Sequence, residues 1–71
     1  MEDKDYLKLI GENISSIRKS KNLSTNEFAS RCEMEKSNLI PIEKGRINVT
    51  INTLIKIANA LNVPLDDLLK F

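Results

Sequence analysis

The 71-residue sequence lacks histidine and contains one cysteine, Cys32. A disulfide within the chain needs two thiols and a Cys/His zinc site needs histidine, so neither can form. Cys32 is therefore expected to be a small buried apolar side chain. The lack of histidine also argues against acid–base and nucleophilic catalysis, and no serine stands in the glycine-flanked setting of a hydrolase nucleophile. We predict neither an enzyme nor a protein that binds a metal, a cofactor or a small-molecule substrate.

Long apolar runs are also missing, and the first residues, MEDKDYLK, contain no apolar signal core. These absences predict no membrane span and no secretion, and hence a cytoplasmic protein. The sequence has no strand alternation, no phosphate-loop glycine pattern and no internal repeat. With 41% hydrophobic and 30% charged residues, it is typical of one folded domain over residues 1–71. A core of this size gives a net stability of only roughly 3–5 kcal/mol.

The small net charge of +1 conceals an uneven distribution. Residues 18–46 contain seven bases and four acids, so this stretch carries +3, whereas acids gather at both ends of the chain. A basic middle is compatible with a surface that faces phosphate groups.

One amphipathic helix is predicted near the start of the chain and another in its last third. The first spans about residues 4–20, with an apolar stripe of Leu7, Ile10, Ile14 and Ile17. Gly11 inside it indicates a close approach by another helix. The second spans residues 51–61 after a cap at Thr50, with a stripe of Ile51, Leu54, Ile57, Ala58 and Leu61. Asn62 should end that helix in a left-handed conformation.

A short last helix is expected over residues 65–70, after Pro64. Asp66 and Asp67 could be mistaken for a metal-binding pair. Their position favours a simpler interpretation, since carboxylates stabilise the positive first turn of a helix.

The central stretch, residues 24–45, predicts two short helices joined by a tight turn. Ser24 and Glu27 have the spacing of a capping box, so a helix begins at Thr25 and buries Phe28, Ala29 and Cys32. A second helix follows over residues 36–44, with Leu39 and Ile42 inward and Gly45 as its stop. Helix, turn and helix in this order form a helix-turn-helix.

This sequence resembles the phage-repressor and Cro-type (XRE-like) helix-turn-helix family over roughly residues 10–69. The resemblance is carried by Ile14, Ile17-Arg18, Leu23-Ser24, Phe28-Ala29, Ile42-Glu43-Lys44-Gly45, Thr53-Leu54, Ile57-Ala58, Ala60-Leu61 and Val63. It implies an all-α, compact, five-helix, lambda-repressor-like domain that regulates transcription. Such a domain binds a double-stranded DNA operator, as a homodimer, with its third helix in the major groove.

The resemblance implies two groups of DNA-binding residues. The residues expected to face bases are Lys36, Ser37, Asn38, Ile40 and Pro41, and those expected to contact the backbone are Thr25, Asn26, Lys44, Arg46 and Asn48. A serine or lysine can hydrogen-bond base edges, and an isoleucine can meet a thymine methyl. Each of these residues could equally be ordinary solvated surface, and their grouping around one helix favours the functional interpretation.

The sequence departs from the family pattern at three positions. Glu33 replaces a glycine, so a left-handed residue there carries strain of about 1 kcal/mol. Glu35 replaces the usual Ser or Thr cap and adds a negative charge. Pro41 removes a backbone hydrogen bond inside the third helix, and its ring should lie outside the core.

Arg18 and Glu43 are expected to form an ion pair between the first and third helices, as the resemblance implies. Each directly follows a core residue, so both side chains leave the border of the buried stripe. An ordinary exposed pair is the alternative.

Apolar residues beyond the needs of the core, namely Ile47, Val49, Ile55, Leu65 and Phe71, are candidates for a dimer surface near the C-terminal end. The sequence does not distinguish a phage repressor from a restriction–modification controller or an antitoxin. A helical module whose main partner is another protein, such as an antitoxin, is the remaining alternative function.

Overall fold

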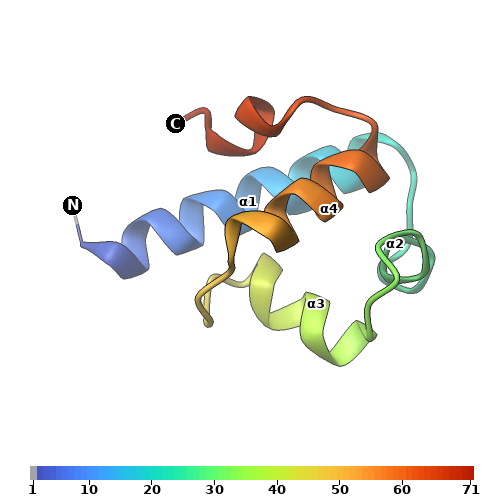
Figure 1. Ribbon diagram of the computed structural model, residues 1–71, viewed down its shortest axis with the longest axis horizontal. Coiled ribbons are helices and arrows are strands. Elements are labelled where there is room, and N and C mark those ends of the chain that lie inside the picture. The colour runs from blue at the N-terminus through green and yellow to red at the C-terminus, as the bar shows by residue number, and fades with distance from the viewer. Residues whose placement is uncertain (1) are drawn as a thin grey trace.

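The computed structural model describes residues 2–71 and is all-α over this range. The elements are α1 (Asp3–Ser20), α2 (Thr25–Arg31), α3 (Lys36–Glu43), α4 (Ile51–Leu61) and the 3₁₀ helix η1 (Leu65–Leu69). In Figure 1, α1 forms the long axis, with η1 above it and α3 below it. The predicted all-α class is confirmed. Of the five predicted helices, four are α-helices and the last is a 3₁₀ helix, so the exact prediction of five regular helices is not confirmed.

The last element differs from the prediction because its backbone hydrogen bonding follows the 3₁₀ pattern. The amide of Asp67 donates to the carbonyl of Pro64 at 3.1 Å, which is the i to i+3 bond of a 3₁₀ turn. Both aspartates lie near the start of η1, as expected, and both are near the Lys70 ammonium, with Asp67 the closer at 2.7 Å. This local pairing holds the end of the turn.

The helix boundaries follow the predicted caps. The Ser24 hydroxyl accepts from the Glu27 amide at 3.1 Å, and the Glu27 carboxylate accepts from the Ser24 amide at 3.1 Å. Thr50 Oγ1 accepts from the Thr53 amide at the start of α4. Asn62 adopts φ 58° and ψ 43°, so the predicted left-handed stop is confirmed.

One core contains side chains from every helix. Its fully buried members are Ile14, Phe28, Cys32, Leu39, Ile57, Leu61 and Leu68. The prediction for Ile51 was wrong: it lies at the first position of α4, before the helix reaches the core, and is 58% exposed. Burial is the main reason why the pKa of the Cys32 thiol is raised to about 11, and the nearby Glu43 carboxylate adds to it.

Two glycines allow α1 to lie against the C-terminal end of α3. A Cβ atom on Gly11 would lie 2.6 Å from the carbonyl oxygen of Ile42 and would also meet that of Glu43. Gly45 has φ +69°, and a Cβ there would meet the Lys8 backbone. The close helix approach predicted from Gly11 is therefore confirmed.

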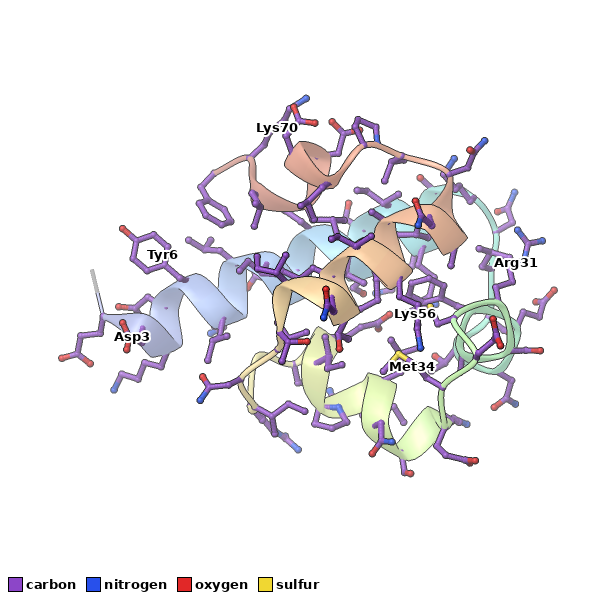
Figure 2. All side chains as sticks on the ribbon, in the orientation of Figure 1. Asp3, Tyr6, Arg31, Met34, Lys56 and Lys70 are labelled. Atoms are coloured by element: carbon purple, nitrogen blue, oxygen red, sulfur yellow. The ribbon has the colours of Figure 1, made fainter. Side chains whose placement is uncertain are left out.

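The C-terminal segment returns along α1, which the sequence did not predict. The Asn13 side chain donates to the carbonyls of Leu68 and Lys70, at 3.0 and 2.9 Å. The rings of Tyr6 and Phe71 also meet, with their centroids 5.9 Å apart (Figure 2 shows Tyr6 on this side of α1). Within residues 2–71, no helix combines the length and the apolar character needed to cross a membrane.

Candidate nucleic-acid interface

The turn between α2 and α3 is built by a left-handed residue at Glu33. Its φ is 55°, and the next amide, that of Met34, donates to the carbonyl of Ala29 at 3.0 Å. This bond and the left-handed residue form a Schellman motif, which closes the end of α2 and redirects the chain into α3. The predicted left-handed conformation of Glu33 is confirmed.

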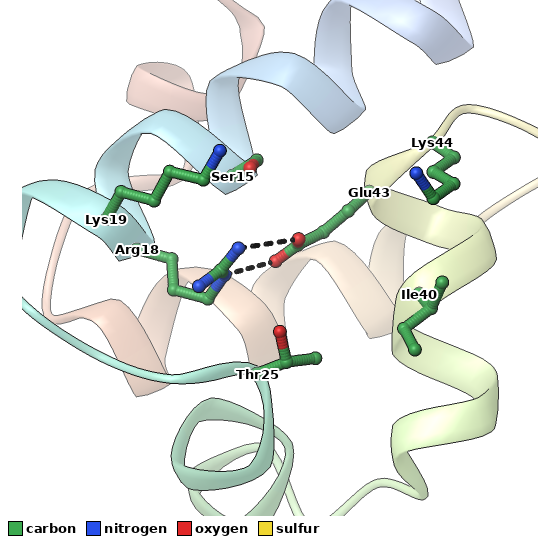
Figure 3. A pocket seen from close by; sticks show the side chains of 7 residues that line it. All are labelled: Ser15, Arg18, Lys19, Thr25, Ile40, Glu43 and Lys44. Atoms are coloured by element: carbon green, nitrogen blue, oxygen red, sulfur yellow. Dashed lines mark hydrogen bonds and ion pairs between the residues drawn. The ribbon is translucent and has the colours of Figure 1, made fainter.

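The C-terminal end of α3 is joined to α1 by the predicted ion pair (Figure 3). Arg18 Nε and Nη2 donate to the two carboxylate oxygens of Glu43, at 2.8 and 3.2 Å. Arg18 Nη1 also donates to the carbonyl of Leu23 at 2.9 Å. The two side chains are only 11% and 10% exposed, so the alternative of an ordinary exposed pair is wrong. A bidentate pair fixes orientation as well as distance, and this one therefore sets the angle of α3.

The first three residues of α3 are exposed, although Leu39 in the same turn is buried in the core. Lys36, Ser37 and Asn38 are exposed, and Ile40 and Pro41 are half-buried. The helix continues through Pro41, which is half-buried rather than buried in the core, as predicted. The structure thus brings the five base-facing candidates together on the outer side of one helix and at its free end.

The backbone candidates lie at two other places. Thr25 and Asn26 form the first turn of α2, and the exposed residues Lys44, Arg46 and Asn48 follow the last turn of α3. Thr25 and Lys44 line the same hollow, described next, whereas Asn26, Arg46 and Asn48 do not.

This hollow, of about 330 Å³, lies beside the ion pair between α1, α2 and α3 (Figure 3). It is lined by Ser15, Arg18, Lys19, Thr25, Ile40, Glu43 and Lys44. Three basic side chains and one acid give the lining a positive charge. Sequence reasoning did not select Lys19, although it directly follows Arg18 in the basic last turn of α1, which is the signal that could have found it.

The arrangement offers hydrogen-bond donors and positive charge around an exposed helix. Among residues 2–71, no group of three or more acidic, histidine or cysteine side chains is placed to hold a metal ion. What the side chains can do is bind anionic groups and the donors and acceptors of base edges.

Comparison with known proteins assigns the chain to a family. A model of the helix-turn-helix domain matches residues 11–70. The chain belongs to the XRE-like helix-turn-helix family of transcriptional regulators.

Individual relatives include a control protein and a phage repressor. The chain is 38% identical to control protein C.BamHI of Bacillus amyloliquefaciens, over 89% of this chain and 79% of that protein. It is 33% identical to the immunity repressor of Bacillus phage phi105, over 76% of this chain but only 38% of the repressor.

A solved structure is similar over almost its entire length. The restriction-modification controller protein C.AhdI of Aeromonas hydrophila superposes with a TM-score of 0.84 and 27% identity, over 87% of this chain and 94% of C.AhdI. The proteins compared are regulators rather than enzymes.

Proposed function

We propose that this protein is a sequence-specific transcriptional regulator that inserts α3 into the major groove of a double-stranded DNA operator. One observation carries the proposal: α3 is fixed to α1 by a buried bidentate ion pair at one end, while its other end is exposed. The major groove is wide enough for one α-helix, and its base edges differ between base pairs. A helix that is held at one end and exposes its first three residues meets that requirement.

The proposed base contacts come from the exposed side of α3. Ser37 and Asn38 can both donate and accept hydrogen bonds, and Lys36 can donate to guanine acceptors. Ile40 offers a methyl surface for thymine. Pro41 occupies a position next to these side chains without a donor of its own, so it can contribute only shape.

The proposed backbone contacts come from two segments beside the base contacts. Thr25 and Asn26 lie in the first turn of α2, and Lys44, Arg46 and Asn48 follow α3. To these we add Lys19, because it shares the positive hollow with Thr25 and Lys44. Together with nearby amides, they supply about four to six phosphate contacts for each bound protomer.

Salt-dependent DNA binding tests this proposal. Log affinity should fall with log salt at a slope of about −0.9 per phosphate neutralised. Lys44→Ala, Arg46→Ala and Lys19→Ala should each weaken binding to all sequences alike and reduce the slope by about 1. Ser37→Ala should change the preference at particular base pairs instead.

The matched control is Lys70→Ala. Its ammonium carries the same charge but follows η1, on the side of α1 away from α3 (Figures 1 and 2). This substitution should leave the salt slope unchanged. If the protein has no affinity at low salt for any duplex in a genomic or random pool, the proposal is wrong.

We further propose that the protein binds as a homodimer, because one short helix contacts too few base pairs for useful specificity. Two of the five candidate surface residues, Val49 and Leu65, are half-buried and pack against the core, so the expected patch changes. Among residues 2–71, the large exposed apolar side chains are Tyr6, Ile47, Ile51, Ile55, Leu69 and Phe71. Ile51 and Ile55 stand one turn apart on α4 and form the centre of the proposed surface.

Sedimentation tests the dimer. The protein should sediment as a dimer at high micromolar concentration and bind with two protomers per duplex, whereas Ile55→Lys should be monomeric. The matched control is Asn52→Lys, which adds the same charge at an exposed position of α4 beside the patch and should remain dimeric. A wild-type monomer that binds one per duplex would contradict this part of the proposal.

The regulated system that the relatives favour is restriction–modification control. C.BamHI is named a control protein, and C.AhdI, which matches over 94% of its length, is a restriction-modification controller. A restriction enzyme gene beside this one, and a change in its transcription when this protein is removed, would support the assignment. A neighbouring toxin gene, with the toxin bound by this protein, would favour the antitoxin alternative.

A further inference from the structure

Glu35 occupies the free end of α3 without performing the usual task of a residue at that position. It is the N-cap of the helix, and its carbonyl accepts from the amides of Asn38 and Leu39 at 2.9 and 3.1 Å. Its carboxylate, however, accepts no capping hydrogen bond, unlike the side chains of Ser24 and Thr50 at the starts of α2 and α4. It is exposed, and no ion pair within residues 2–71 includes it. All of its acceptor capacity is therefore available to a ligand.

The position places this free carboxylate among the proposed base contacts. Recognition helices contact base edges with their N-terminal residues, and Glu35 directly precedes Lys36 and Ser37. A carboxylate beside DNA is repelled by phosphates and loses water as the helix enters the groove. A base-edge donor can compensate for that loss. In the major groove, the donors are the amino groups of cytosine and adenine, and a carboxylate typically accepts from cytosine N4.

We infer that Glu35 is a specificity-determining residue that accepts a hydrogen bond from the N4 amino group of a cytosine in each operator half-site. The inference rests on the proposed function, since it requires that α3 enters the major groove. The Glu35 carboxylate at the N-terminus of α3 would then take a direct part in selecting a base. A carboxylate cannot accept from the O4 of thymine, so a thymine at the same position leaves the charge without a partner.

Selection of bound duplexes from a random library, followed by competition between single-base variants, tests the inference. The wild-type protein should enrich cytosine at one position of each half-site, and replacing it by thymine should weaken binding by about fivefold or more. Glu35→Gln should shift the preference at that position toward adenine, because a glutamine amide pairs with adenine N6 and N7. Glu35→Ala should bind all four bases at that position within about twofold, and its affinity for unrelated duplexes should rise because a negative charge has been removed.

Glu33→Gln is the matched control. Glu33 is another exposed acid of the same inter-helix turn, two residues earlier, and the substitution removes the same charge. It should raise the affinity for all duplexes slightly and leave every base preference unchanged. Thermal denaturation should show that all three variants fold, since neither side chain has a partner within the described chain.

The outcomes separate this inference from the proposed function. If Glu35→Ala and Glu35→Gln keep the wild-type preference at every position, Glu35 contacts no base and the inference is overturned while the proposed function stands. The same conclusion holds if Glu33→Gln changes the cytosine preference as strongly as Glu35→Gln, because charge alone would then explain it. If the wild-type protein enriches no duplex, the proposed function itself is wrong, and this inference with it.

Discussion

The two ends of α3 differ in almost every respect. At the C-terminal end, the Glu43 carboxylate is buried and bonded twice to Arg18, and Gly11 lets the backbones of α1 and α3 touch. At the N-terminal end, the Glu35 carboxylate is exposed and unbonded within the described chain. The same side chain thus has opposite surroundings at the two ends of one helix. The helix is fixed at one end, and the exposed residues Lys36, Ser37 and Asn38 lie at the other, so substitutions at the two ends should have different consequences.

The largest effect is expected from Glu43→Ala. Removal of one partner strands the buried Arg18 charge, which costs about 3–5 kcal/mol. A domain of this size has roughly 3–5 kcal/mol of net stability, so the variant should be mostly unfolded. Urea denaturation followed by circular dichroism measures the loss, and Arg18→Ala should show a similar one.

The control for this prediction lies at the other end of the same helix. Lys36→Ala removes a charge from an exposed position and should change the free energy of unfolding by less than about 0.5 kcal/mol. Losses below about 1 kcal/mol in both ion-pair variants would show that the fixed end of α3 does not depend on this pair.

Gly11→Ala should have the next largest effect. The new methyl group would meet backbone carbonyls of Ile42 and Glu43, which cannot rotate away as a side chain can. We expect a loss of about 2–3 kcal/mol, more than the roughly 1 kcal/mol that alanine gains inside a helix. Ser16→Ala, at an exposed position of α1, should be neutral or slightly stabilising. A Gly11→Ala variant as stable as the wild type would mean that the two helices can separate at little cost.

The caps of α2 and α3 should respond in opposite directions. Ser24→Ala removes a capping hydrogen bond and should destabilise the domain by about 1 kcal/mol. Glu35→Ser adds a capping side chain where none acts and should stabilise it by about 0.5–1 kcal/mol. Thermal or urea denaturation of both variants measures the difference. A loss of stability in Glu35→Ser would show that the free end of α3 already has a partner.

The smallest effect is expected at Glu33, in the turn before α3. Glycine adopts φ 55° without strain, so the substitution should relieve about 1–2 kcal/mol. Glycine also makes the unfolded chain more flexible, and the larger entropy loss on folding removes part of this gain. Glu33→Gly should therefore stabilise the domain by under about 1 kcal/mol. Glu33→Ala keeps the Cβ atom and should show no such gain, so equal stability of the two variants would contradict the strain argument.

The fold was predictable wherever local chemistry fixed it. The box at Ser24, the cap at Thr50 and the left-handed Asn62 each depend on neighbours within a few residues, and each was found. The conformation of η1 was missed because the sequence alone does not separate a short 3₁₀ turn from one turn of α-helix. The return of the C-terminal segment was missed for another reason: Asn13 bonds to carbonyls 55 and 57 residues away, and one asparagine gives no sign of such a partner.

The site was predictable where the family pattern reached it. The ion pair of Arg18 and Glu43 was predicted because both residues belong to that pattern. The sequence placed both side chains at the border of the core but left an exposed pair open, and the structure shows that the pair is buried. Lys19 was not found, since its place in the hollow depends on the way three helices meet. Similarly, Val49 and Leu65 pack against the core whereas Ile51 is exposed. All three residues are hydrophobic, so hydrophobicity alone does not predict which of them the fold covers.

The buried thiol of Cys32 can report how often this domain opens. A thiol reagent reacts with the thiolate, and both the burial and the raised pKa of about 11 keep that form scarce in the folded protein. The folded state holds this proton more tightly than the unfolded state, so the thiol favours folding below pH of about 9, and this contribution is lost as the pH rises toward about 11. At neutral pH, the labelling rate then measures the fraction of molecules that are open at any moment. DNA that binds only the closed domain should slow the labelling in proportion to its occupancy, which allows affinity to be measured through an atom that never contacts the DNA.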